Sequence, residues 1–292
     1  MMTAKHLPWR DAAGRFSPFK TAVLLLLFVP ACWVAIAYAT GTLGARPLNE
    51  AIHEIGRWTI RLLFLSLAVT PLRQALSWPQ GMLVRRMIGV GAFAYAVLHL
   101  LLYAVDQAFD LPKIATEIAI RIYLLIGFVA LAGLSALAAT STNAMVRRLG
   151  GRRWQRLHRL VYPIAILAVI HQFLQSKANV VEPSWMAGLL FWLLAWRLIA
   201  ARCKGGRVPL WATASLGIAA AALTGLGEAI YFHLKLGAPL ALVLEANFAA
   251  ATGLRPAWVV AGTGLALLAG AALRRTLRPA AGPRGRPAAE TA

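Results

Sequence analysis

Long apolar stretches alternate with short polar and basic stretches along most of the chain. A helix needs about 20 mainly apolar residues to cross the hydrocarbon core of a bilayer. Eight stretches approach or meet that length, and they predict membrane-spanning helices at residues 20–40, 52–72, 87–105, 120–140, 159–175, 184–201, 208–232 and 256–273. The second is the weakest, because ionisable residues stand in its first turns. We therefore expect an all-α fold, a polytopic bundle of membrane helices.

The same pattern divides the chain into four parts. Residues 1–19 form a polar and basic N-terminal segment, and residues 20–201 contain the first six spans. Residues 202–273 contain two further spans, and residues 274–292 are rich in Pro, Gly and Arg, a composition typical of a disordered tail. Just before the fifth span, we expect residues 151–159 to form a basic loop.

The composition excludes an ordinary soluble domain, because 60% of the residues are hydrophobic and only 14% are charged. The net charge of +20 could suggest a nucleic-acid partner, but the basic residues stand in short loops between the spans. Most of them fall on one side of the predicted bundle and most acidic residues on the other, as the positive-inside rule requires. We therefore expect that membrane lipid surrounds the bundle and that both termini lie in the cytoplasm. We expect no nucleic-acid partner.

Two histidines at similar depth are the main candidates for chemistry. His99 in the third span and His171 in the fifth both lie toward the outer side of the predicted bundle. Two imidazoles that face each other from neighbouring helices can be the axial ligands of one haem iron. Either histidine alone could instead serve packing through a hydrogen bond to a neighbouring helix. Their matched depth favours haem ligation. His53, at the outer end of the second span, is either a further outer-face site or an ordinary interfacial histidine.

A second group of candidates lies toward the cytoplasmic side. His158 does not share a helix face with His171, and Arg85 stands near the start of the third span. We expect His158 and Arg85 to form an inner site for a second haem or another cofactor, with the arginine on a propionate, a flavin phosphate or a quinone. Further candidates for contact with acidic cofactor groups are Arg86, Arg152, Arg153 and Trp154. For the arginines, the alternative is topology together with contact to lipid headgroups.

Several familiar motifs are missing from the sequence. It contains no P-loop, no glycine-rich dinucleotide fingerprint and no cysteine cluster. A redox protein without a nicotinamide domain must receive electrons from quinol, a small flavin or a partner. We assign no catalytic residue in this chain.

Three stretches carry a family resemblance. They are LGARPLNEAIHEIGRWTIRLLFLSLAVTPLR, VRRMIGVGAFAYAVLHLLLYAV and TSTNAMVRRLGGRRWQRLHRLVYPIAILAVIH. They resemble the MsrQ family (formerly YedZ), the haem-binding membrane subunits of the periplasmic methionine sulfoxide reductase system, which are related to the ferric reductase transmembrane domain. The resemblance covers about residues 10–200, and its most specific part is TSTNAM…LGGRRWQRLHRLVY.

The resemblance implies a bacterial inner-membrane protein that contains haem b and FMN. It implies electron delivery from the quinone pool to MsrP, a periplasmic molybdopterin subunit on which the catalytic chemistry takes place. The histidines of the family match His99, His158 and His171, and Arg85 matches an arginine in the same basic pair. The expected fold is a six-helix ferric-reductase-like core, and the departure from the family is the pair of extra C-terminal spans.

Two other functions compete with this electron relay. One is a membrane ferric reductase-type oxidoreductase with another acceptor, against which the missing flavin–nicotinamide domain counts. The other is an ion transporter that uses its intramembrane histidines, which discontinuous helices and inverted repeats would favour. We find neither of those features clearly in the sequence.

Overall fold

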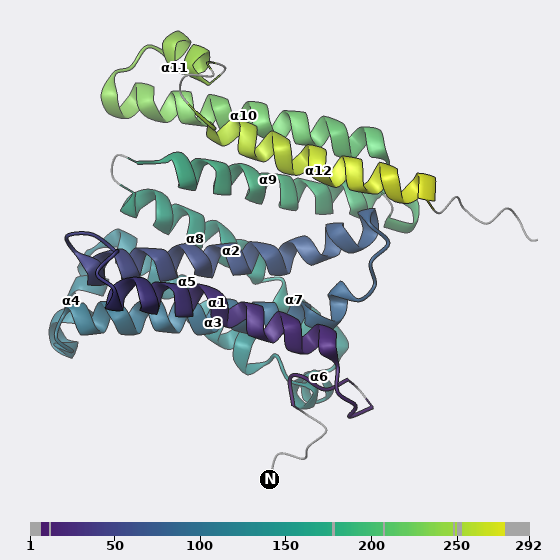
Figure 1. The fold of residues 1–292 in the computed structure, drawn as a ribbon, viewed down its shortest axis with the longest axis horizontal. Helices are drawn as coiled ribbons and strands as arrows, with labels where there is room; N and C mark the ends of the chain where they lie inside the picture. The colour runs from purple at the N-terminus through teal and green to yellow at the C-terminus, as the bar shows by residue number, and fades with distance from the viewer. Residues whose placement is uncertain are drawn as a thin grey trace, which may run out of the picture.

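The computed structural model describes residues 7–11, 13–176, 179–206, 208–247, 249 and 253–277. Among these residues, eight helical segments are long and apolar enough to cross a membrane, and they correspond to the eight predicted spans. These segments are α1 (Pro18–Ala39), α2 (Pro47–Ala75), α3 (Gly81–Asp106), α5 (Ile122–Ala139), α7 with α8 (Gly151–His158 and Val161–Gln175), α9 (Val181–Arg202), α10 (Leu210–Leu236) and α12 (Pro256–Leu277). The predicted polytopic all-α membrane bundle is confirmed (Figure 1).

Short helices occupy several of the connections. They are α4 (Leu111–Ile120), α6 (Asn143–Leu149), the 3₁₀ turn η2 (Lys204–Gly206) and α11 (Leu240–Ala246). The start of α4 follows from its sequence, because the Asp110 side chain accepts a hydrogen bond from the backbone N–H of Lys113 at 3.0 Å.

The prediction of a basic loop at residues 151–159 is wrong, because most of this stretch is the helix α7. Its Arg, Gln and Leu residues are good helix formers, and it contains no proline. Gly150, with a φ of +74°, separates α6 from α7, and two turn residues separate α7 from α8. The basic residues are therefore displayed on a helix at the membrane boundary.

Two prolines inside spanning helices leave nearby backbone groups without their helical hydrogen-bond partners. Side chains of other helices form hydrogen bonds with these groups instead. A proline lacks the N–H that would bond the carbonyl four residues earlier, so Pro71 leaves the carbonyl of Leu67 without its helical donor. The guanidinium of Arg197 on α9 donates to this oxygen. Next to Pro30, the hydroxyl of Tyr95 accepts from the N–H of Ala31 at 2.9 Å and donates to a carbonyl of the preceding turn at 2.7 Å. The side-chain hydrogen bonds at both prolines therefore connect neighbouring helices.

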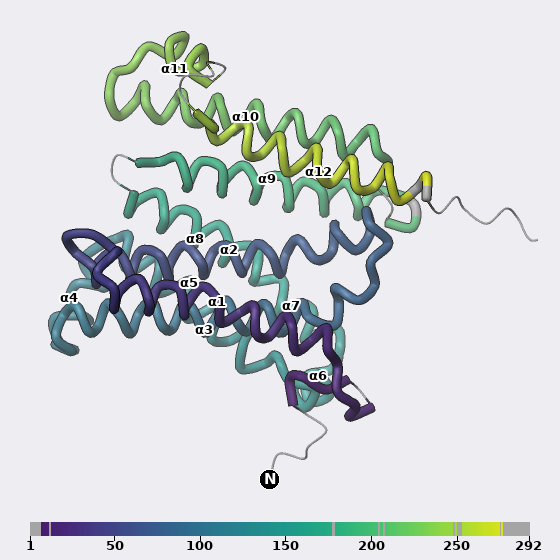
Figure 2. The backbone as a smooth tube through the Cα atoms, in the orientation of Figure 1, coloured from purple at the N-terminus to yellow at the C-terminus, as the bar shows by residue number. Residues whose placement is uncertain are grey.

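The helices lie side by side, and their ends gather at two faces of the bundle. The α1–α2 connection, the end of α8, the start of α9, α4 and α11 lie at one end, on the left of Figure 2. The connection α2–α3, the helices α6 and α7 and the end of α12 lie at the other. We call these the α4 end and the α6 end. The order agrees with alternating spans of a multi-pass membrane protein.

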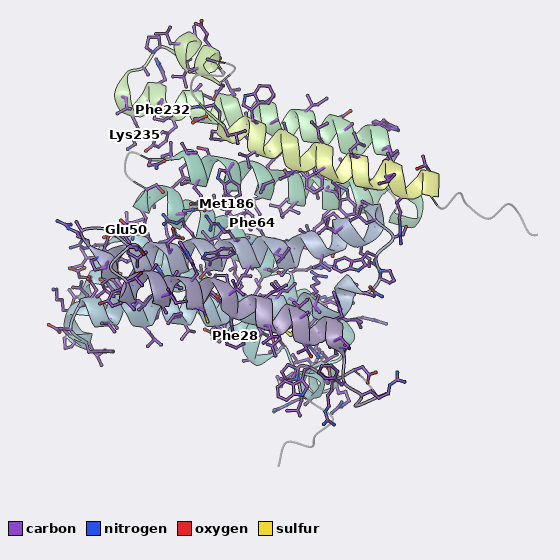
Figure 3. All side chains as sticks on the ribbon, viewed as in Figure 1. Phe28, Glu50, Phe64, Met186, Phe232 and Lys235 are labelled. Atoms are coloured by element: carbon purple, nitrogen blue, oxygen red, sulfur yellow. The ribbon has the colours of Figure 1, made fainter. Side chains whose placement is uncertain are left out.

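The outer surface of the bundle is apolar, as a surface in contact with lipid must be. Phe28 on α1 points away from the other helices, whereas Phe64 and Met186 lie between α2 and α9 (Figure 3). Large exposed apolar side chains occur on most spans, and they include Leu25, Phe28, Ile36, Leu101, Phe128, Leu198, Ile218, Leu223 and Leu265.

The last two spans pack closely on the first six. They form a layer against α9 (Figure 1), and small residues permit the close approach. A Cβ atom at Gly188 would stand 2.0 Å from the Thr224 hydroxyl oxygen of α10 and 2.8 Å from a methyl group of Val260 on α12. Within this layer, Arg255 forms an ion pair of 2.8 Å with the fully buried carboxylate of Glu228.

We predict that Gly188→Ala lowers the stability of the protein. The added methyl group overlaps Thr224, and overpacking of this kind costs about 1–3 kcal/mol. Thermal unfolding in detergent, followed by tryptophan fluorescence, measures the change. The control is Gly227→Ala on α10, where a Cβ atom meets nothing within 4 Å. An unchanged melting temperature for Gly188→Ala would contradict the close packing of α9 on α10 and α12.

Candidate cofactor site

The rings of His99 and His171 lie next to each other inside the bundle. His99 extends from α3 and His171 from α8, and the two ring centroids are 6.3 Å apart with an interplanar angle of 85°. Helices far apart in the sequence thus bring two imidazoles together at one depth. The matched depth expected from the sequence is present in the structure.

Each imidazole is oriented by a hydrogen bond to a different helix. His99 Nδ1 donates to the carbonyl of Ile52 on α2 at 2.8 Å, and His171 Nδ1 donates to the carbonyl of Tyr123 on α5 at 2.7 Å. A carbonyl can only accept, so the proton of each neutral ring stands on Nδ1. The Nε2 atom of each ring therefore carries the lone pair that can bind a metal.

A glycine stands four residues after each of these carbonyls and makes room for the ring. A Cβ atom at Gly56 would lie 3.0 Å from two atoms of the His99 ring, and one at Gly127 would lie 2.8 Å from two atoms of the His171 ring. The same arrangement of carbonyl, glycine and histidine thus occurs twice, once between α2 and α3 and once between α5 and α8. Sequence reasoning missed both glycines, because the sequence does not show which helix a given helix face packs against.

The two histidines line a cavity of about 460 Å³. Its walls are mainly apolar, and they come from α2, α3, the end of α4, α5, α8 and the start of α9. Polar side chains also line it, among them His53, which therefore lies in the same cavity as His99 and His171. The polar lining residues are Glu50, His53, Arg57, Thr59, Tyr103, Gln172, Gln175, Ser176, Asn179 and Glu182. The volume lies within the range of small-molecule and cofactor pockets.

The geometry fits two axial ligands of one metal. An imidazole nitrogen binds a first-row metal at about 2 Å, and the ring centre lies about 1 Å behind that nitrogen, so two opposed rings have centres about 6 Å apart. The observed separation of 6.3 Å agrees with this value. The cavity beside the rings provides space for an apolar macrocycle, and its polar residues can meet acidic substituents.

A network of ion pairs stands at the edge of this cavity. Glu182 on α9 pairs with Arg61 at 2.6 Å and with Arg57 at 3.6 Å, and Arg57 also pairs with Glu54 on its own helix. The guanidinium of Arg61 lies 5.0 Å from the centre of the Trp58 ring. The charged residues that weaken the apolar pattern of the second span therefore join α2 to α9. Sequence reasoning missed Glu182 as their partner.

His158 lies apart from this cavity, near the α6 end. Its ring stacks on Trp154, with centroids 3.8 Å apart and an angle of 25°. Its Nδ1 donates to the Trp154 carbonyl at 3.1 Å, and its Nε2 lies 3.3 Å from the Ser141 hydroxyl oxygen. Arg85 is close enough to interact electrostatically with this ring. Arg85 itself is half-buried on α3.

The other candidates at this end are placed differently. Arg86 is exposed and donates to the side chain of Asn143 at 2.8 Å. Arg152 and Arg153 are exposed on α7. Trp154 is half-buried, and its indole N–H donates to the Thr140 carbonyl at 2.9 Å, which fixes the ring that stacks on His158.

Comparison with known proteins gives a consistent group of relatives. A family model described as a ferric reductase like transmembrane component matches residues 55–169. The chain is 44% identical over 203 residues to the protein-methionine-sulfoxide reductase heme-binding subunit MsrQ of Rhodospirillum rubrum, and the match covers 68% of this chain and 95% of that protein. It is 41% identical to the subunits of the same name from Azospira oryzae (66% and 84% covered) and Ralstonia nicotianae (65% and 93% covered). No solved structure matches the chain.

Proposed function

This chain belongs to the MsrQ family of haem-binding membrane subunits, and we propose that it is the electron-transfer subunit of a protein-methionine-sulfoxide reductase. The observation that carries the proposal is the pair His99 and His171, whose ring centres lie 6.3 Å apart and whose Nε2 lone pairs are both available to a metal. These two residues would hold the iron of a b-type haem. Bound there, a haem would supply one-electron redox chemistry.

The protein residues around the pair have distinct tasks. The carbonyls of Ile52 and Tyr123 fix the orientation of the rings and raise the basicity of their Nε2 atoms. The apolar walls exclude water from the site, which limits side reactions. His99 and His171 would both be engaged in holding the haem and not in acting on a substrate. The site is therefore suited to pass electrons, and we assign the reduction of methionine sulfoxide to a partner.

The distribution of charge supports an orientation in the membrane. The acidic residues Glu50, Asp106, Asp110, Glu117 and Glu182 lie near the α4 end, whereas arginines concentrate at the α6 end. We propose that the α6 end and both termini face the cytoplasm of a bacterium and that His99 and His171 lie in the periplasmic half of its inner membrane. The acceptor is then an MsrP-like molybdopterin subunit at the α4 end.

The electrons in this proposal come from the quinone pool, with FMN as a second cofactor. The contacts of His158 with Trp154 and its proximity to Arg85 support an inner cofactor site, for a second haem or for the flavin. Residues 20–201 form the haem-binding core, and the last two spans are an addition to it. Repair of oxidised periplasmic proteins is the process that such a relay would serve.

We predict that His99→Ala and His171→Ala each remove most of the haem from a protein that still inserts in the membrane. Each variant removes one of two axial nitrogens, and loss of a ligand prevents six-coordinate binding. The measurement is haem per chain by pyridine haemochromogen spectra on detergent-purified protein. His233→Ala serves as the control, because this exposed residue at the end of α10 lies outside the cavity. Haem at the wild-type level in both variants would refute the pairing.

We also predict that Gly127→Ala weakens haem binding without removing a ligand. The added methyl group would lie 2.8 Å from the His171 ring and must displace it from the Tyr123 carbonyl. Loss of such an orienting contact typically weakens metal binding about 10- to 100-fold. A haem titration of the apoprotein measures the effect. Gly89→Ala on α3, where a Cβ atom meets nothing within 4 Å, should bind haem as the wild type does.

Removal of the chain from residue 208 onward should leave haem binding intact. The described residues that line the cavity all precede residue 184, so the last two spans contribute none of its walls. The shortened protein should keep the haem content and absorption spectrum of the full chain. Haem loss in a shortened protein that remains monodisperse in detergent would show that the extra spans belong to the core.

A further inference from the structure

A second cavity lies between α2, α9 and α12 and has a volume of about 330 Å³. Its walls are mainly apolar, and they include Phe64 of α2 and Met186 of α9, which lie between these two helices in Figure 3. Leu65 also lines the cavity and is 45% exposed on the outer surface of the bundle. An apolar molecule can therefore enter from the membrane. We call this cavity the α12 groove.

Helix α2 stands between the α12 groove and the histidine cavity. On α2, the histidine cavity is lined by residues that include Ile60 and Leu63, whereas the groove is lined by residues that include Phe64 and Ala68. No described residue lines both spaces. The two sets overlap in depth, because they occupy different faces of the same helical turns. Occupants of the two spaces would thus lie about one helix diameter apart, roughly 10 Å.

The wall of the groove contains a hydrogen-bond donor without an acceptor. Trp192 of α9 is only 7% exposed, and its buried indole N–H donates to no other group in the part of the chain that the structure describes. Trp192 stands near the middle of its span, where no water is present to accept the bond. A buried N–H without an acceptor is unfavourable, so this position favours an occupant that supplies one.

A hydroxyl group of α12 lines the same groove. Thr263 donates its hydrogen to the carbonyl of Val260 at 2.8 Å, so the lone pairs of its oxygen remain able to accept. Trp192 and Thr263 each lie about two turns or more from the ends of their helices. The groove thus combines apolar walls with one donor and one acceptor at the depth of the hydrocarbon core.

We propose that the α12 groove binds the ring of an isoprenoid quinone or quinol from the membrane. A quinone carbonyl can accept from the Trp192 N–H, a quinol hydroxyl can donate to Thr263, and the isoprenoid tail would leave past Leu65 into the lipid. A phospholipid acyl chain would fit the apolar walls, but it carries no acceptor at this depth and would leave the indole N–H unpaired. This proposal rests on the proposed electron relay, which draws its electrons from the quinone pool.

The proposal also gives α12 a role. Thr263 and Leu267 form the wall of the groove on the side of the last two spans, which are an addition to the six-helix core. These spans contribute no described residue to the histidine cavity. Changes in the groove should therefore alter quinone binding without removing the haem.

The test is photolabelling of the full-length protein, purified in detergent, with an azido-ubiquinone and with decylubiquinone as competitor. Mass spectrometry identifies the labelled peptides, and the competitor concentration that gives half protection measures affinity. Ala68→Phe fills the groove from α2, and Trp192→Phe removes the N–H but keeps an aromatic ring. The matched controls are Ala35→Phe and Trp33→Phe on α1, because both residues are exposed and lie outside the groove.

We expect the label in the wild type on peptides of α2, α9 or α12, with protection by decylubiquinone. Trp192→Phe should raise the half-protecting concentration about 2- to 10-fold, the effect of one neutral hydrogen bond. Ala68→Phe should raise it roughly tenfold or more through a direct clash with the ring. Ala35→Phe and Trp33→Phe should behave as the wild type.

Label confined to other helices, or an unchanged half-protecting concentration in either folded variant, would overturn the quinone site. If Ala68→Phe does not fold, the conservative Trp192→Phe decides the test alone. A phospholipid that copurifies with the wild type and is lost from Ala68→Phe, while quinone binding is unchanged, would identify a lipid as the occupant and overturn the proposal. Haem content reports separately on the relay. A wild-type protein without haem would refute the relay, whereas haem-loaded variants with unchanged quinone binding would refute only the α12 groove.

Discussion

The structure depends on a hydrogen bond that occurs twice, from a histidine Nδ1 to a helix carbonyl four residues before a glycine. In one copy His99 of α3 donates to Ile52 beside Gly56, and in the other His171 of α8 donates to Tyr123 beside Gly127. The bond fixes the tautomer and the direction of each ring, and the glycine lets the ring approach the helix backbone. The two Nε2 atoms can therefore bind one metal only if α2, α3, α5 and α8 pack in the correct register. The site depends on the packing of these four helices.

Polar groups inside the bundle follow the rule that a membrane provides no water to satisfy them. Arg197 donates to the carbonyl that Pro71 exposes, and Tyr95 inserts its hydroxyl beside Pro30. Glu182 pairs with arginines of α2 at the edge of the cavity. Each of these groups has a partner on another helix, so the same contacts that satisfy polar atoms also hold the bundle together.

The apolar pattern of the sequence was sufficient to predict the eight spans, because their length is set by the thickness of the bilayer. The depth of a residue in the membrane could also be estimated from its position along the span. This depth predicted that His99 and His171 lie close together. The direction in which each side chain points around its helix could not be predicted from the sequence, because it depends on how the helices pack. That is why Gly56, Gly127 and Glu182 were missed and why residues 151–158 were expected to form a loop.

The haem site and the inner cofactor site would serve opposite halves of one bundle. His158 and His171 are separated by thirteen residues along α7 and α8, which corresponds to about 20 Å of helical rise. Most of a hydrocarbon core about 30 Å thick therefore lies between them. A single haem at His99 and His171 would leave the α6 end, which we propose faces the cytoplasm, distant from the redox centre. A cofactor beside His158 would divide that distance into shorter steps.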